Sequence, residues 1–210
     1  MQDVVLDACC VINLHAAGKI LSGEALRSKP RRQRILMLGS TPQAIPQAKK
    51  LALDFNLHLP IKVKGEAKYV LQPDKEDVSK LVKADIDLDP LTKAGLLHEC
   101  DLEGEDEIGL FVQMATKLDD GEAACFAIAK CRGWLLATDE RPTERLAKQH
   151  GVSIITTPEL VKHWADKTEA SEGDVAKVLW NIQTYAHYFP RKNLPMHSWW
   201  MHLVKQARSP

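Results

Sequence analysis

Three acidic side chains stand where α/β proteins commonly place their chemistry. Asp7 and Asp139 each follow a short apolar segment, and Glu122 opens a stretch of small residues that precedes Asp139. Carboxylates that converge on one cleft repel one another unless a cation neutralises them, and hard oxygen ligands suit Mg²⁺ or Mn²⁺ rather than zinc. The three acids therefore predict a divalent-cation site.

Each of these acids also has a structural interpretation. Asp7 and Asp139 are candidate N-caps for the helices expected after them. Glu122 lies where a negative charge favours the helix dipole, and Asp119 or Asp120 is available to cap the same helix. Taken singly, each acid is explained well in this way, so the residues alone leave both interpretations open.

The elements expected around the acids would bring them together. Strands and helices alternate along the chain, which implies parallel strand pairing with right-handed crossovers and hence an α/β layered fold. Ligands bind such sheets outside the carboxyl ends of the strands, where Asp7 and Asp139 lie. The expected strands cover residues 3–6, 35–38, 69–71, 134–137 and 152–156, and the expected helices cover 8–16, 24–27, 43–55, 90–97, 105–114, 123–130, 142–150, 174–188 and 198–206.

Two features of these helices can be checked directly. Asp89 is available as the N-cap of the helix 90–97. Ile108, Phe111, Val112 and Ala115 lie on one apolar face of the helix 105–114, which predicts that this face is buried.

Composition excludes several classes of protein. The chain is 45% hydrophobic and 27% charged, as is typical of globular proteins, and no apolar run reaches the ~18 residues of a membrane span. Because 28 basic residues balance 28 acidic ones, any contact with RNA must come from a local patch such as the run KPRRQR at 29–34. The N-terminus lacks the pattern of a secretion signal, so a cytoplasmic location is expected.

Cysteine and histidine patterns favour no other catalytic centre. Cys9 and Cys10 are adjacent while the other three cysteines are scattered, so the ligand pairs of a zinc ribbon are absent and reduced thiols are expected. The sequence has no Gly-x-Ser-x-Gly elbow, no His-Glu-x-x-His motif and no glycine-rich phosphate loop. The acids remain the main candidates for chemistry.

Three segments together resemble the PIN-domain family of metal-dependent ribonucleases, many of which are toxins of toxin–antitoxin pairs. The segments are VVLD at 4–7 with INL at 12–14, LDDGEAA at 118–124 with Ala127 and Ala129, and LLATDER at 135–141 with 146–147 and 151–152. The resemblance covers residues 1–165 and implies a three-layer PIN-like fold, with a mainly parallel sheet flanked by helices. Residues 166–210 are then a helical extension, whose Trp199 and Trp200 are expected to pack on the same chain or on a partner.

The resemblance also implies a function. Asp7, Glu122 and Asp139 would bind Mg²⁺ or Mn²⁺ and catalyse hydrolysis of RNA phosphodiester bonds. A small protein antitoxin and a homodimer are implied as partners, and no membrane is involved. Asn13, Thr138 and Arg141 are candidate contacts to the substrate or to water.

One position departs from the family pattern. A further acid is usual early in the second helical region, but Gln47 stands there, and an amide contributes no negative charge to a cation site. Glu107, Asp120 and Glu140 are candidates to supply the missing charge, with Glu107 the additional metal ligand to test.

Two alternative functions remain open. A catalytically decayed PIN-like module with a binding or regulatory role is favoured by Gln47 and by the zero net charge. A phosphatase-like hydrolase with Asp7 as nucleophile lacks its usual second acid two residues later, because Cys9 occupies that position.

Overall fold

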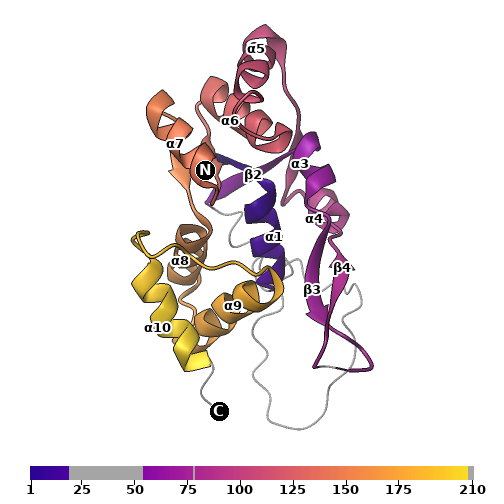
Figure 1. Ribbon diagram of the computed structural model, residues 1–210, viewed down its shortest axis with the longest axis vertical. Coiled ribbons are helices and arrows are strands. Elements are labelled where there is room, and N and C mark those ends of the chain that lie inside the picture. Colours follow the sequence, from indigo (N-terminus) through magenta and orange to yellow (C-terminus); the bar gives the residue numbers. More distant parts are fainter. Residues whose placement is uncertain (19–53, 78, 208–210) are drawn as a thin grey trace.

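The computed structural model describes residues 1–18, 54–77 and 79–207. Its centre is a five-stranded parallel sheet with the order β5-β2-β1-β6-β7, flanked by helices (Figure 1). This confirms the predicted α/β fold and is consistent with three layers. The strands are β1 (Gln2–Leu6), β2 (Phe55–Pro60), β5 (His98–Cys100), β6 (Leu135–Ala137) and β7 (Ile154–Ile155).

Helices connect the strands, and several end as their sequences predict. Both α6 and α7 end at a glycine in the left-handed conformation, Gly133 and Gly151, which no other residue adopts as easily. The helices of the described residues are α1 (Ala8–Ala16), α3 (Ile61–Glu66), α4 (Asp89–Lys93), α5 (Gly104–Met114), α6 (Asp120–Arg132), α7 (Arg141–His150), α8 (Thr157–Thr168), α9 (Glu172–Tyr185) and α10 (His197–Ala207).

The strand β1 lies at the point where the order of strand addition along the sheet reverses. From β1 the chain adds β2 and β5 on one side and β6 and β7 on the other. The side chains of Val4, Val5 and Leu6 are buried, as expected for a central parallel strand covered on both faces. In open α/β sheets ligands bind at such a switch point, beyond the carboxyl ends of the strands, and Asp7 and Asp139 follow β1 and β6 there.

The segment around β2 differs from its prediction. Phe55 is the first residue of a strand rather than the last of a helix, and it is buried in the sheet. The rest of the predicted helix 43–55 lies outside the described residues, as do Gln47, the helix 24–27, the strand 35–38 and the basic run 29–34.

Two helix predictions are wrong in detail. The N-cap of α4 is Leu88, and Asp89 lies within the first turn. In α5, Ile108 is 49% exposed and Val112 is 60% exposed, whereas Phe111 and Ala115 of the same predicted face are partly buried against the core. The predicted face is therefore only half covered, and the buried Glu107 pairs with Arg132 of α6.

A two-stranded antiparallel hairpin stands outside the main sheet. It consists of β3 (Tyr69–Pro73) and β4 (Leu81–Asp85), with Tyr69 opposite Asp85. The exposed strand predicted at 69–71 is therefore present. The hairpin contacts α1 and α9, and Figure 1 shows it running beside α1.

The C-terminal helices pack on the rest of the chain. The helix α9 contacts α1, β3 and α10, and the Trp200 side chain of α10 is fully buried with its ring 5.6 Å from that of Tyr188. The helix α8 continues to Thr168, past the boundary expected at residue 165. Within the described ranges, no helix has the length and apolar character needed to cross a membrane.

Candidate functional site

Asp7 joins the ends of β1 and β6. Its backbone N–H donates to the carbonyl of Ala137 at 3.1 Å, and its side chain caps α1 by accepting from the Ala8 N–H at 2.7 Å. The Thr138 hydroxyl donates to the other carboxylate oxygen at 3.0 Å. Asp7 is only 3% exposed. The capping interpretation of Asp7 is correct, and Thr138 orients this carboxylate.

Glu122 belongs to a reciprocal cap at the start of α6. Asp119 accepts from the Glu122 N–H at 2.9 Å, and Glu122 accepts in turn from the Asp119 N–H at 3.4 Å. The Thr143 hydroxyl donates to Glu122 at 2.8 Å. Glu122 is 8% exposed, so this carboxylate too is fixed in orientation by a threonine.

Glu66 is the functional candidate that the sequence analysis missed. It is the last residue of α3, and its carboxylate lies against the first turn of α6. A Cβ atom at Gly121 would lie 2.1 Å from Glu66 Oε2, so only a glycine at this position lets the carboxylate come so close. A hydrogen bond from the Gly121 backbone favours the charged form of Glu66.

Asp7, Glu66, Asp119 and Glu122 form what we term the acidic cluster. Burial raises the pKa of Asp7 and Glu122, partial desolvation raises that of the largely exposed Glu66, and the charges of neighbouring acids raise these pKa values further. The four acids therefore lie close enough to influence one another's protonation.

Asp139 is a hydrogen-bond acceptor for several elements. One carboxylate oxygen accepts from the Thr157 N–H at 3.0 Å and from the Tyr188 hydroxyl at 3.0 Å. The other accepts from the Asn13 amide at 3.1 Å, the Thr157 hydroxyl at 2.5 Å and the Cys10 thiol at 3.6 Å. The N-cap of α7 is Glu140, so the expected capping role of Asp139 at that helix is wrong. Its carboxylate instead joins α1, the start of α8 and the segment after α9.

Cys9 lies between Asp7 and Asp139. Its thiol donates to Asp7 at 3.4 Å and accepts from the Asp139 N–H at 3.4 Å. The ligand atoms of Cys9, Cys10 and Asp139 lie within 4.8 Å of one another, which makes these residues a possible metal-binding group. Burial raises the pKa of the Cys10 thiol. A hydrogen bond with Cys10 lowers the pKa of Cys9, but burial and the two adjacent carboxylates outweigh it and the pKa rises. Metal binding by this group would require both thiols to lose their protons.

Most of the other predicted site residues lie apart from the acidic cluster, but Asp120 adjoins Asp119 and its charge raises the pKa of Glu66. Glu107 pairs with the Arg132 guanidinium at 2.7 Å, which lowers the pKa of Glu107. Asn13 is buried and contacts Asp139 and Thr157. Arg141 is exposed at the first position of α7. The exposed Asp120 lies 3.9 Å from the Lys62 ammonium, and Glu140 is also exposed.

A signal for Glu66 was present in the sequence. Phe55, Leu57 and Leu59 alternate with polar residues, which is the period of a strand with one apolar face. An acid on the helix after that strand is then brought to the carboxyl edge of the sheet. The helix predicted across Phe55 hid this pattern.

Comparisons of the chain with protein-family models, with curated proteins and with solved structures found no match.

Proposed function

We propose that this protein is a divalent-cation-dependent hydrolase of RNA phosphodiester bonds. The observation that carries the proposal is the acidic cluster, where the buried carboxylates of Asp7 and Glu122 and that of Glu66, which lies against Gly121, gather next to the switch point of the sheet and repel one another. A divalent cation would remove that repulsion. The PIN-domain resemblance of residues 1–165 supports RNA as the substrate.

The acids of the cluster fit Mg²⁺ or Mn²⁺ by their chemistry. Asp7, Glu66 and Glu122 offer carboxylate oxygens, and Glu66 adds a negative charge that the sequence analysis did not count. Asp7 and Glu122 each accept hydrogen bonds but retain lone pairs, because an ionised carboxylate has about four acceptor sites. These hard oxygen ligands suit Mg²⁺ or Mn²⁺ better than the softer sulfur atoms of Cys9 and Cys10 do.

The residues of the chain would then have different roles in phosphodiester hydrolysis. A bound cation polarises the scissile phosphate and lowers the pKa of an attacking water. Thr138 and Thr143 hold the carboxylates of Asp7 and Glu122 in fixed orientations. Asp139 keeps α1 and α8 in place through Asn13 and Thr157 and so acts as a positioning residue. The toxin role, the protein antitoxin and the homodimer rest on the resemblance alone.

A second candidate is a PIN-like binding module without catalysis. It is favoured by Asp139, whose carboxylate accepts five hydrogen bonds, including one from Tyr188. Those donors leave few lone pairs for a metal ion. This candidate predicts RNA or protein binding without cleavage.

Cleavage of end-labelled single-stranded RNA tests the proposal. We expect cleavage with Mn²⁺ or Mg²⁺, none in EDTA, and at least a hundredfold slower cleavage by Asp7→Asn and Glu66→Gln, an order-of-magnitude expectation for lost electrostatic stabilisation. Glu140→Gln is the matched control, because this exposed acid adjoins Asp139 outside the cluster. Cleavage that persists in Asp7→Asn, or that needs no divalent cation, would contradict the proposal.

A further inference from the structure

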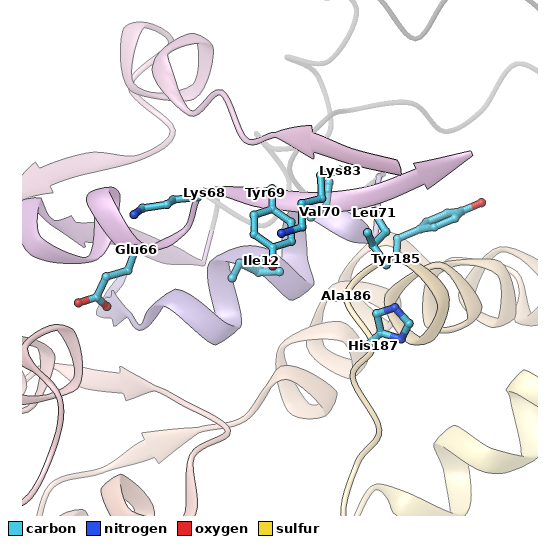
Figure 2. Close-up of a pocket in the computed structure, with 10 residues that line it drawn as sticks. All are labelled: Ile12, Glu66, Lys68, Tyr69, Val70, Leu71, Lys83, Tyr185, Ala186 and His187. Carbon is cyan, nitrogen blue, oxygen red and sulfur yellow. The ribbon is translucent and has the colours of Figure 1, made fainter. Parts of the chain in front are cut away.

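A cleft of about 520 Å³ separates the hairpin β3–β4 from α1 and α9. We call it the hairpin cleft. Figure 2 shows its lining side chains in a row, with Glu66 at one end and Tyr185 and His187 at the other. Sites for small molecules typically measure about 300–1,000 Å³, so the hairpin cleft has room for one nucleotide.

Two lysines give the hairpin cleft a positive charge. Lys68 precedes β3 and Lys83 lies on β4, and both line the cleft. Neither ammonium pairs with a carboxylate of the residues that the structure describes, whereas Lys62 and Lys64 on the neighbouring helix α3 both do. Unpaired ammonium groups in a concave surface attract phosphate.

The hairpin cleft also offers ring surfaces. The Tyr69 side chain is 42% exposed, and the Lys83 ammonium lies 4.0 Å from its ring centroid. His187 lines the far end and has a φ of 52°, in the left-handed region that a residue with a Cβ rarely adopts. Backbone strain of this kind concentrates at ligand sites. Between the rings lie apolar side chains such as Ile12 and Leu71.

Glu66 joins the hairpin cleft to the acidic cluster. It lines the cleft, and its carboxylate lies against Gly121 in the first turn of α6, next to Glu122. A chain that lies in the cleft therefore has a phosphate next to the proposed cation site.

We propose that the hairpin cleft binds a nucleotide of single-stranded RNA. The Lys83 ammonium, which lies over the Tyr69 ring in this structure, moves to a phosphate beside Lys68, and the Tyr69 ring then stacks on the base. The proposal rests on the RNA-hydrolase function above. Bases of a single strand can leave the stack and lie on aromatic rings, whereas those of a duplex cannot. The cleft therefore selects single strands over duplexes.

Fluorescence anisotropy of a short labelled single-stranded RNA, measured in EDTA, tests this binding apart from catalysis. We expect Lys68→Gln and Lys83→Gln each to weaken binding and to reduce the slope of log affinity against log salt by about 0.7, the value for one lost phosphate contact on a single strand. Lys75→Gln is the matched control, because this exposed lysine lies in the turn of the same hairpin but outside the cleft. An unchanged slope in Lys68→Gln and Lys83→Gln, or an equal change in Lys75→Gln, would overturn the proposal.

Two further variants test stacking. Tyr69→Leu should weaken binding about fivefold or more, while Tyr69→Phe keeps the ring and should bind as the parent does. Equal affinity of the parent for a duplex of the same sequence, or full affinity in Tyr69→Leu, would overturn the stacking contact.

Glu66→Gln separates this proposal from the proposed function. Without a cation the Glu66 carboxylate repels phosphate, so this variant should bind RNA in EDTA at least as tightly as the parent, although it cleaves poorly. If the parent binds RNA through the hairpin cleft but never cleaves it, the proposed function fails and the cleft stands. If the parent cleaves RNA but cleft variants bind normally, the cleft proposal fails and the function stands.

Discussion

The carboxylates of the acidic cluster are also structural residues. Asp7 caps α1, and Glu122 completes the reciprocal cap of α6 with Asp119. The capping and metal-binding interpretations of these acids are therefore compatible. Asparagine caps helices about as well as aspartate does, so Asp7→Asn tests cation binding while preserving the cap.

Glu107 provides a test of which acids belong to the proposed cation site. Its buried carboxylate pairs with Arg132, and removal of its charge leaves the guanidinium without its main partner. We expect Glu107→Gln to lower the free energy of unfolding by about 2 kcal/mol and to leave Mn²⁺ affinity unchanged. Urea denaturation and calorimetric titration measure the two quantities. A large loss of Mn²⁺ affinity with intact stability would instead make Glu107 a metal ligand.

Tyr188 provides a second test at the level of the residue. Its buried hydroxyl donates to Asp139, and burial with the adjacent carboxylate raises the pKa of Tyr188. Tyr188→Phe keeps the ring against Trp200 but removes the hydroxyl. We expect a loss of about 1 kcal/mol in the free energy of unfolding, because Asp139 keeps its bonds from Thr157. Unchanged stability in urea denaturation would show that the hydroxyl contributes nothing.

At the level of elements, prediction worked where local signals agreed. The segments 134–137 and 142–150 combined an apolar strand with a helix that ends at Gly151, and both elements are present. Prediction failed where a long-range contact decides the packing. In α5 the buried Glu107 pairs with Arg132 of α6, and the position of Glu66 depends on the contact between α3 and α6. No local sequence pattern predicts contacts between helices that lie far apart in the sequence, so only part of the candidate site was predictable.

The contact between α3 and α6 gives a prediction for Gly121. Gly121→Ala places a methyl group where the flexible Glu66 carboxylate lies, so the carboxylate moves and the fold stays. We expect Mn²⁺ affinity to fall by about tenfold and the free energy of unfolding to change by less than about 1 kcal/mol. Gly109→Ala in α5 is the control, since open space surrounds that position. It should raise stability by about 1 kcal/mol without affecting Mn²⁺. Equal Mn²⁺ affinities in both variants would contradict this role of Gly121.

At the level of the whole molecule, the fold brings acids from the end of β1, from α3 and from the start of α6 into one cluster. The alternation of strands and helices was enough to predict that Asp7 and Asp139 follow strands at one edge of a parallel sheet. It was not enough to separate their roles. Asp7 belongs to the acidic cluster, whereas the C-terminal segment delivers Tyr188 to Asp139.

The raised pKa values of the acids in the cluster predict that the stability of the protein depends on pH. The pKa values of Asp7, Glu66 and Glu122 lie above the ordinary 3.8 and 4.5, so the folded state binds more protons than the unfolded state between the ordinary and the raised values. The contribution of these groups to stability therefore falls as the pH rises through that window. A cation favours the charged forms, so Mn²⁺ should raise Tm by about 5 °C near pH 7.5 and by much less near pH 5. Equal shifts of Tm at both pH values in thermal denaturation would contradict this linkage.

The most direct test of the acidic cluster is calorimetric titration of the parent protein, Glu66→Gln and Glu140→Gln with Mn²⁺. The account predicts that the parent and Glu140→Gln bind Mn²⁺ alike, and that Glu66→Gln binds it at least about tenfold more weakly. Absence of binding by the parent, or equal binding by Glu66→Gln, would contradict the claim that this cluster is a cation site.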